Sequence, residues 1–194
     1  MTAKHQFERL TAQLLFLFGQ DYTPLRRGLP IVAAPEALFS YARAADIVND
    51  TLGEGFSQMT ELVYHIYMWG PLLKLFRISD HNIALGKFFQ SAAGSLSPDG
   101  VAEERTPDKL VRVIMEGKKD DANLNNLAEQ GHRYVTNMNV HPDSLLLILV
   151  VGTNFCIYKV RAQAQVLEIY GNINARSARS CQEAFATILH LLQS

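Results

Sequence analysis

The chain has 194 residues, 48% of them hydrophobic and 19% charged, and its formal net charge is −1 at pH 7. This composition predicts a globular protein with a substantial core rather than a disordered chain. The near-zero net charge creates no overall positive field, so we expect no nucleic-acid partner. The apolar runs are too short for a membrane span and the first residues lack a signal-peptide layout, so we expect no membrane insertion. Two cysteines give no disulfide framework, which favours a cytoplasmic location.

The first 93 residues are expected to form four or five helices. Apolar residues recur at helical spacing from about Thr2 to Phe18, and Gly19 ends that run. Pro35 can occupy the first turn of a second helix, and Gly70-Pro71 should kink or divide a third, very apolar one at Phe56–Phe76. Ser79 or Asp80 can cap a further helix, which would carry Ile83, Phe88 and Phe89.

The middle of the chain is more polar. Residues 94–105 are expected to be an exposed turn or flexible loop, and 94–106 is a possible sub-domain boundary within a single domain, 1–194. Thr106-Pro107-Asp108 predicts the start of a short helix with Leu110, Val113 and Ile114 on its apolar face. Residues 118–121 are expected to be a solvated turn before a weaker helix that ends near Gly131, and Val135-Thr136 is compatible with a short strand or a loop.

The C-terminal part predicts a meander of three strands followed by a helix. Leu145–Val151 contains no polar residue, which is typical of a strand covered on both faces, and Gly152-Thr153-Asn154 ends it. Phe155–Val160 and Val166–Tyr170 follow, and short connections favour antiparallel pairing, although the register between the last two strands stays open. Ser180 and Glu183 have the spacing of a capping box. The predicted fold class is α+β, with a helical N-terminal half packed on a small antiparallel sheet of about three strands and closed by a C-terminal helix.

Known chemical motifs are absent from the sequence. Gly117-Lys118-Lys119 lacks the upstream glycine and the Ser or Thr of a phosphate-binding loop, and no zinc-binding spacing occurs, so we expect no metal and no cofactor. Cys156 with His141 or His132 is a possible nucleophile and base, but a cysteine in an apolar strand more often behaves as a small hydrophobe. His65 is compatible with a haem ligand or a proton-transfer group, and more often such a histidine lies at the edge of a core.

Two groups of residues are candidates for a partner-binding surface. Four basic residues near the predicted sheet and its helix would form a patch for a phosphate or an acidic peptide, with ordinary solvated charge as the alternative. Three large apolar residues follow the predicted helix kink and would cover a partner if they are exposed. These candidates are Lys159, Arg161, Arg176 and Arg179, and Leu72, Leu75 and Phe76.

Three functional hypotheses follow. The first is a non-enzymatic protein-interaction module, such as an adaptor, an assembly subunit or a secretion-chaperone-like component of a larger complex, with another protein chain or a second copy as its partner. The alternative is a small-molecule sensor with an apolar pocket against the sheet, next to Cys156, Tyr158 or His65. The third is an enzyme of unfamiliar type, for which the sequence names no catalytic residue beyond Cys156 and His141.

Overall fold

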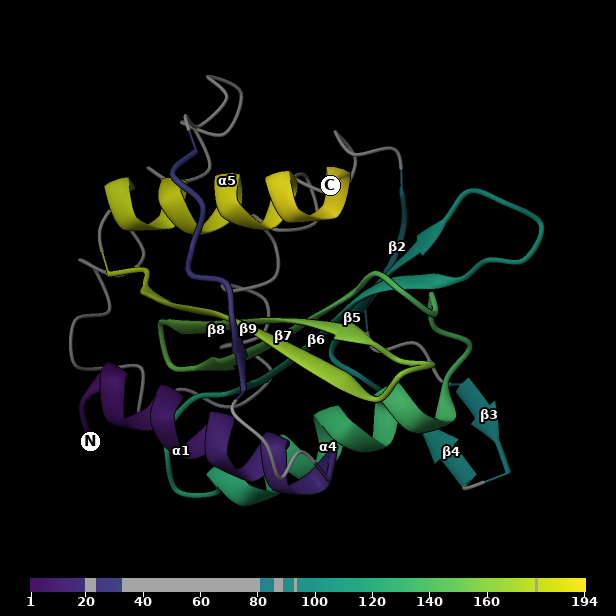
Figure 1. The fold of residues 1–194 in the computed structure, drawn as a ribbon, viewed down its shortest axis with the longest axis horizontal. Helices are drawn as coiled ribbons and strands as arrows, with labels where there is room; N and C mark the ends of the chain where they lie inside the picture. Colours follow the sequence, from purple (N-terminus) through teal and green to yellow (C-terminus); the bar gives the residue numbers. More distant parts are fainter. Residues whose placement is uncertain (20–23, 33–80, 86–88, 93, 177) are drawn as a thin grey trace.

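A computed structural model describes residues 1–19, 24–32, 81–85, 89–92, 94–176 and 178–194 of the chain. A mixed sheet forms the middle layer of these residues; helix α5 covers one face, and helices α1 and α4 cover the other (Figure 1). The described helices are α1 (Ala3–Leu17), α4 (Leu124–Asn137) and α5 (Ala178–Gln193). None of them is long and apolar enough to cross a membrane.

Seven strands form the large sheet in the order β1-β9-β8-β7-β6-β5-β2, and β3 and β4 form a separate hairpin. The bounds are β1 (Leu25–Arg26), β2 (His81–Leu85), β3 (Phe89–Ser91), β4 (Gly94–Leu96), β5 (Gly100–Glu104), β6 (Val111–Lys118), β7 (Leu145–Val151), β8 (Asn154–Arg161) and β9 (Val166–Asn174). The prediction of a small antiparallel sheet of about three strands is therefore wrong. The sheet is larger, and it is mixed because β6–β7 and β1–β9 are parallel pairs.

The C-terminal meander confirms the predicted strands. Every residue of β7 is buried, with 0% to 3% of its surface exposed. Gly152 has a positive φ of 59°, which lets the chain turn tightly into β8. The open register is now fixed, with Lys159 opposite Glu168 and a bulge between Ile157 and Tyr158. Helix α5 begins at Ala178, two residues before Ser180, so the predicted capping box is wrong; Glu183 instead accepts a hydrogen bond from Arg179 Nε at 3.1 Å.

The middle of the chain differs most from expectation. The predicted loop at 94–105 contains β4 and β5, and the helix predicted after Thr106 is the eight-residue strand β6. Lys109 N donates to Thr106 O at 3.1 Å, so Thr106–Lys109 is a turn that joins β5 to β6. The β-branched residues of β6 favour a strand, and both faces of the sheet bury them.

The N-terminal part confirms one of the expected helices. Helix α1 lies where the apolar spacing predicts, with Thr2 as its N-cap. The helix expected after Ser79 or Asp80 is wrong, because β2 and β3 occupy that part of the chain. The helices expected at 35–52 and 56–76 lie outside the described residues.

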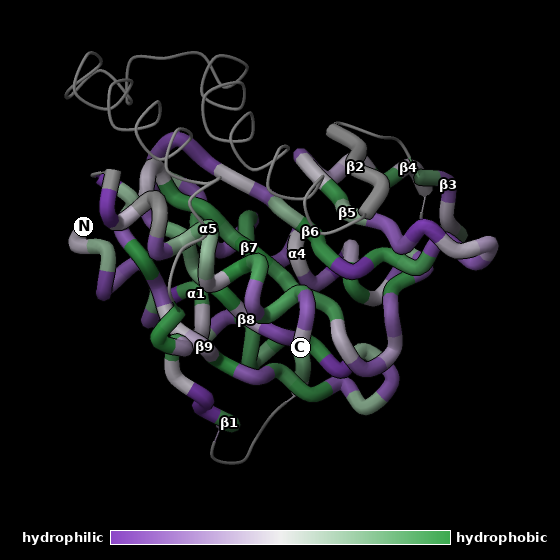
Figure 2. Tube along the Cα trace, turned by 90° about the horizontal axis from the view of Figure 1, so that it is seen from above, coloured by the Kyte–Doolittle hydropathy of each residue, from purple (hydrophilic) through white to green (hydrophobic). Residues whose placement is uncertain are grey.

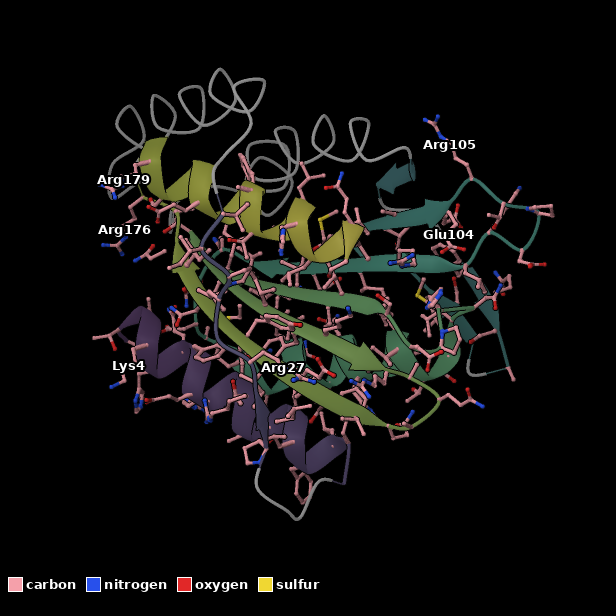
Figure 3. The ribbon with its side chains drawn as sticks, turned by 45° about the horizontal axis from the view of Figure 1, so that its top comes forward. Lys4, Arg27, Glu104, Arg105, Arg176 and Arg179 are labelled. Atoms are coloured by element: carbon pink, nitrogen blue, oxygen red, sulfur yellow. The ribbon has the colours of Figure 1, made fainter. Side chains whose placement is uncertain are left out.

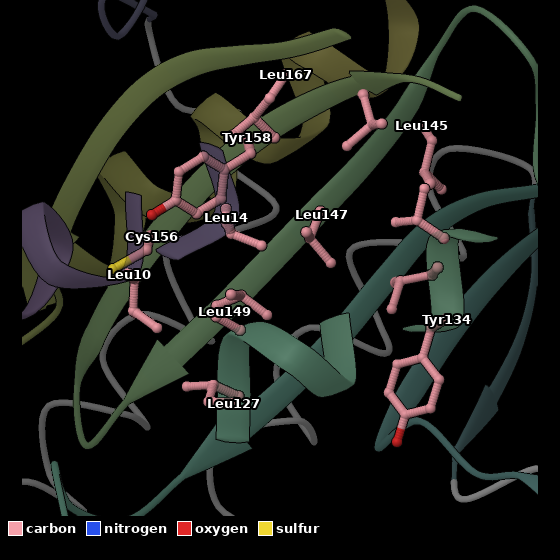
Figure 4. Close-up of a cluster of buried hydrophobic side chains, with 14 of the residues drawn as sticks. Leu10, Leu14, Leu127, Tyr134, Leu145, Leu147, Leu149, Cys156, Tyr158 and Leu167 are labelled. Atoms are coloured by element: carbon pink, nitrogen blue, oxygen red, sulfur yellow. The ribbon is translucent and has the colours of Figure 1, made fainter. Parts of the chain in front are cut away.

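Two apolar clusters lie on the two faces of the sheet. Alternate residues of β7 belong to different clusters: Leu146 and Ile148 face α5, while Leu147 and Leu149 face α1 and α4. Figure 4 shows the second cluster, in which Tyr158 and Leu14 approach from neighbouring elements. Figure 2 shows the same concentration of hydrophobic residues along β7 and β8.

Helix α4 makes the crossover that the parallel β6–β7 pair requires. Gly131 lies at its contact with β7. A Cβ at this position would be only 3.1 Å from Leu149 Cδ2, so glycine allows the close approach. The crossover places α4 beside β6 and brings Tyr134 to Ser97, just before β5, where the candidate site lies.

Candidate active site

The hairpin of β5 and β6 brings two carboxylates together. Gly100 pairs with Met115, so Asp99, just before β5, lies opposite Glu116 near the end of β6. The two residues are cross-linked by hydrogen bonds. Asp99 N donates to Glu116 Oε2 at 3.1 Å, and Gly117 N donates to Asp99 Oδ2 at 2.8 Å. These bonds hold both carboxylates in fixed positions on neighbouring strands.

Lys118 completes a group of three charged side chains. Its Nζ is 3.7 Å from Glu116 Oε1, and alternation along β6 places both side chains on the face that α1 and α4 cover. The Glu116 side chain is 4% exposed and that of Lys118 is 25% exposed. Asp99 is half-buried, so solvent reaches the group from the side of Asp99 and Lys118.

The surroundings of Glu116 oppose its ionisation. Burial and the neighbouring Asp99 carboxylate raise the pKa of Glu116 to about 8, and the Lys118 ammonium only partly offsets this. Two carboxylates that share a buried site repel each other unless a proton or a cation lies with them. Strongly shifted pKa values of this kind concentrate at functional sites, although structural ion pairs can also produce them.

Helix α4 contributes the next layer of the site. The Tyr134 hydroxyl donates to Ser97 O at 3.2 Å and also lies within hydrogen-bond reach of the Glu116 carboxylate. Burial, followed by the charges of Glu116 and Asp99, raises the pKa of Tyr134, which keeps the hydroxyl protonated. Gln130 is one turn earlier on the same helix face, and its buried Oε1 accepts no hydrogen bond among the described residues.

This donor set suits a hard divalent cation. Mg²⁺ is typically held by one or two carboxylates together with waters and substrate phosphates, rather than by a complete protein cage. Asp99 and Glu116 supply two such carboxylates, and a bound cation would relieve their repulsion. Within the described ranges, no group of three or more His, Cys, Asp or Glu side chains is placed to hold a metal. The remaining ligands would therefore come from water and substrate.

The sequence pattern does not predict this site. The pattern places Asp99 in an exposed loop and Lys118 in a solvated turn, and it gives Glu116 no role. A signal was present: if Thr106–Lys109 is interpreted as a β-turn, the two flanking segments pair, and the acids at their far ends become neighbours.

The predicted basic patch is divided between two places. Lys159 and Arg161 line a cavity together with Arg27, whereas Arg179 forms an ion pair with Glu183 on α5. Figure 3 shows Arg176 and Arg179 near the start of α5, away from Arg27. The other three predicted partner-binding residues, Leu72, Leu75 and Phe76, lie outside the described residues, as does His65.

The geometry does not support Cys156 as a nucleophile. Cys156 is completely buried, and burial raises the pKa of its thiol far above the usual range. His132 packs edge-on against the ring of Phe18, with the ring centroids 4.7 Å apart. His141 Nδ1 accepts hydrogen bonds from the backbone amides of Asp143 and Ser144, so it serves a turn.

No family model and no curated protein matches the sequence. Among solved structures, the fold resembles a chain of the cryoEM structure of a DrdV–DNA complex, with a TM-score of 0.54 and 11% identity. The match covers 80% of this chain but only 13% of that chain, so this chain corresponds to a small part of it. At this identity the likeness establishes a shared fold and nothing more. The expectation of no nucleic-acid partner is contradicted by this likeness, because the matched chain comes from a protein–DNA complex. Overall net charge does not report on the charge of a local site.

Proposed function

We propose that this chain hydrolyses phosphodiester bonds in nucleic acid, with a divalent metal ion held by Asp99 and Glu116. The observation that carries the proposal is the cross-linked pair of carboxylates with Lys118 beside it. The likeness of the fold to a chain in a DNA complex supports the choice of substrate class.

Each side chain has a role that follows from its position. Asp99 and Glu116 would hold the cation, and the amides of Asp99 and Gly117 fix the positions of the two carboxylates. Lys118 presents an ammonium beside them, where it can bind a phosphate oxygen and stabilise the charge that develops during hydrolysis. Tyr134 on α4 lies beside Glu116 and favours its ionised form. The metal, when bound, lowers the pKa of a coordinated water and neutralises charge on the phosphate.

The test is cleavage of nucleic acid by the purified chain. Supercoiled plasmid and single-stranded DNA are incubated with Mg²⁺ or Mn²⁺, and parallel reactions contain EDTA. We expect nicking or degradation that requires the metal and that falls at least about 10²-fold in Glu116→Gln.

Glu8→Gln is the matched control, because Glu8 is an exposed carboxylate on α1 and should leave the activity unchanged. Calorimetric titration with Mn²⁺ provides a second readout, in which Glu116→Gln should weaken binding and Glu8→Gln should not. Cleavage that persists in EDTA or in Glu116→Gln would contradict the proposal.

The protein-interaction and small-molecule hypotheses stay predictions. The apolar residues proposed to meet a protein partner lie outside the described residues. For the second hypothesis, Cys156 and Tyr158 are fully buried, and Tyr158 packs against α1 through its hydrogen bond with Thr11 at 3.1 Å.

A further inference from the structure

A second charged site lies elsewhere on the sheet. It is a cavity of about 520 Å³, lined by Arg27, Asp143, Lys159, Arg161, Glu168 and Tyr170. Small-molecule pockets commonly have volumes of about 300–1,000 Å³, and this cavity lies in that range although it is widely open to solvent. Its position and its charge distinguish it from the Asp99–Glu116 site.

The cavity opens on the opposite face of the sheet. Leu167 and Ile169 face α1 and α4, so Glu168 between them points to the face of α5. Along the strands, Glu168 pairs with Lys159, and Lys159 pairs with Leu146 near the start of β7. Glu116 pairs with Leu149, three residues further along β7. The cavity is therefore separated from the candidate active site by the sheet itself.

Glu168 orients two arginines at the cavity. Its side chain is 4% exposed, and its two oxygens lie 3.2 Å from Arg27 Nε and 2.7 Å from Arg161 Nη2. The arginine side chains are 45% and 47% exposed, so each is held at one side and remains accessible at the other. Lys159 adds a third cation and forms no ion pair among the described residues. A guanidinium that is already oriented loses less conformational entropy when it binds an anion.

The remaining groups favour a ligand that also carries hydroxyls. Asp143 is exposed at the cavity, so its carboxylate can accept from a ligand hydroxyl, whereas Glu168 Oε1 is buried and lies 2.7 Å from Arg161 Nη2. Tyr170 contributes an aromatic ring and a hydroxyl, and burial and Glu168 raise the pKa of that hydroxyl, so it stays a donor. The lining carries three cations and two carboxylates, which leaves one positive charge in excess.

We propose that this cavity binds a small phosphorylated molecule with sugar hydroxyls, of the size of a mononucleotide. The phosphate contacts Arg27, Lys159 and Arg161, because guanidinium and ammonium groups are the usual partners of phosphate oxygens. A sugar hydroxyl donates to the exposed Asp143 carboxylate, and the base or another planar group packs on Tyr170. The site does not depend on the metal site, since it lies on the other face of the sheet.

The test is calorimetric titration of the full chain in buffer with EDTA, which removes any contribution from a metal site. The ligands are adenosine 5′-monophosphate, inorganic phosphate and adenosine. We expect the nucleotide to bind, phosphate to bind at least about tenfold more weakly, and adenosine to show no heat at the same concentrations.

Lys159→Gln is the chosen variant because removing Lys159 leaves both ion pairs of Glu168 intact. It should weaken nucleotide binding about five- to tenfold, and Arg27→Gln should do the same. Lys4→Gln, a change of an 84% exposed lysine on α1, is the matched control and should leave binding unchanged.

Three results would overturn the proposal. The first is no detectable nucleotide binding at concentrations up to about 10 mM, which is on the order of the weakest specific affinities. The second is binding of adenosine that is as tight as binding of its phosphate. The third is an unchanged affinity in both variants. Because all titrations contain EDTA, failure of nucleotide binding leaves metal-dependent cleavage untouched, and loss of cleavage leaves nucleotide binding untouched.

Discussion

Glu116 and Glu168 are both 3% exposed and lie on strands of the same sheet, but their neighbours carry opposite charges. Glu168 lies between Arg27 and Arg161 and so has its counter-charges within the chain. Glu116 lies beside the carboxylate of Asp99, with one lysine 3.7 Å away, and its pKa is raised to about 8. A buried carboxylate costs free energy unless it is paired.

The difference indicates what each glutamate does. The Glu168 cluster is electrostatically complete and stabilises the contact between β1, β8 and β9 while it leaves its arginines accessible to an anion. The Glu116 cluster is incomplete, because a proton or an added cation must offset the repulsion from Asp99. A charge without a full counter-charge in a half-accessible site is typical of catalytic centres, where residues that favour binding lower the folding stability.

The largest expected effect comes from a buried carboxylate with no counter-charge at all. Leu147 is completely buried on β7, in the apolar cluster that faces α1 and α4. Leu147→Asp should abolish soluble expression, because it buries a charge with neither an arginine nor a metal site beside it, at a cost above about 4 kcal/mol. Leu147→Met, which keeps the volume, should express normally. A folded Leu147→Asp protein in circular dichroism would show that β7 is less enclosed than the structure indicates.

Burial of β7 was predictable from the sequence because it depends on local pattern. Leu145–Val151 is apolar without interruption, and Gly152 marks its end, so the strand and its burial on both faces follow from the residues themselves. The following strands and the C-terminal helix were predicted for the same reason. In each case the pattern of neighbouring residues along the chain is enough to predict the element.

The β5–β6 hairpin was not predictable in this way. Thr106-Pro107-Asp108 suits a helix start and a β-turn equally well, since proline at the second position and a short polar residue after it occur in both. Only the burial of β6 on both faces, which depends on α4, α5 and β7, decides between them. A bulge between Ala102 and Glu103 then shifts the register, and no residue at that position predicts the bulge.

The candidate site depends on that register, so the sequence contained its residues but not their proximity. Asp99 and Glu116 become neighbours only when the hairpin and its bulge are known. Tyr134 reaches them only because α4 crosses back over the sheet to join the parallel pair β6–β7. The basic patch failed for the opposite reason: Lys159 and Arg179 are near each other along the chain, but β9 carries the chain to the opposite end of β8 before α5 begins.

The second prediction separates function from stability at the incomplete cluster. Asp99→Asn removes one of two repelling carboxylates but keeps an oxygen that can accept from Gly117 N. Metal-dependent cleavage should fall at least about 10²-fold, whereas the thermal unfolding temperature should stay the same or rise. Cleavage rates and thermal scans of the same preparation check both parts. A variant that loses stability in proportion to activity would assign Asp99 a structural role.

The third prediction is a pH dependence of the free energy of unfolding that comes from the ionisation of Glu116. The pKa of Glu116 is about 8 in the folded chain against an ordinary value of 4.5, so the folded chain binds the proton more strongly. The free energy of unfolding should therefore fall as pH rises from about 4.5 to about 8, by about 2–4 kcal/mol. Denaturant titrations across this range should show that slope in the metal-free protein.

Three comparisons identify the source of the slope. Glu116→Gln cannot ionise and should flatten it, whereas Glu8→Gln should keep it. Mg²⁺ should also flatten it, because a cation beside Asp99 favours the ionised form of Glu116. An equal slope in wild type and Glu116→Gln would assign the pH dependence to another group.

The smallest expected effect concerns the complete cluster. Arg161→Ala removes one of the two counter-charges of Glu168 but leaves Arg27 in place. Because the Arg161 side chain is 47% exposed and water can replace part of its contact, the loss should be about 1–2 kcal/mol rather than the larger cost of a fully buried pair. The double variant Arg161→Ala/Glu168→Gln should recover part of that loss, since it no longer leaves a buried charge with a single partner. Additive losses in denaturant titrations would mean that Glu168 does not need its second arginine, and the contrast with Glu116 would then depend on Asp99 alone.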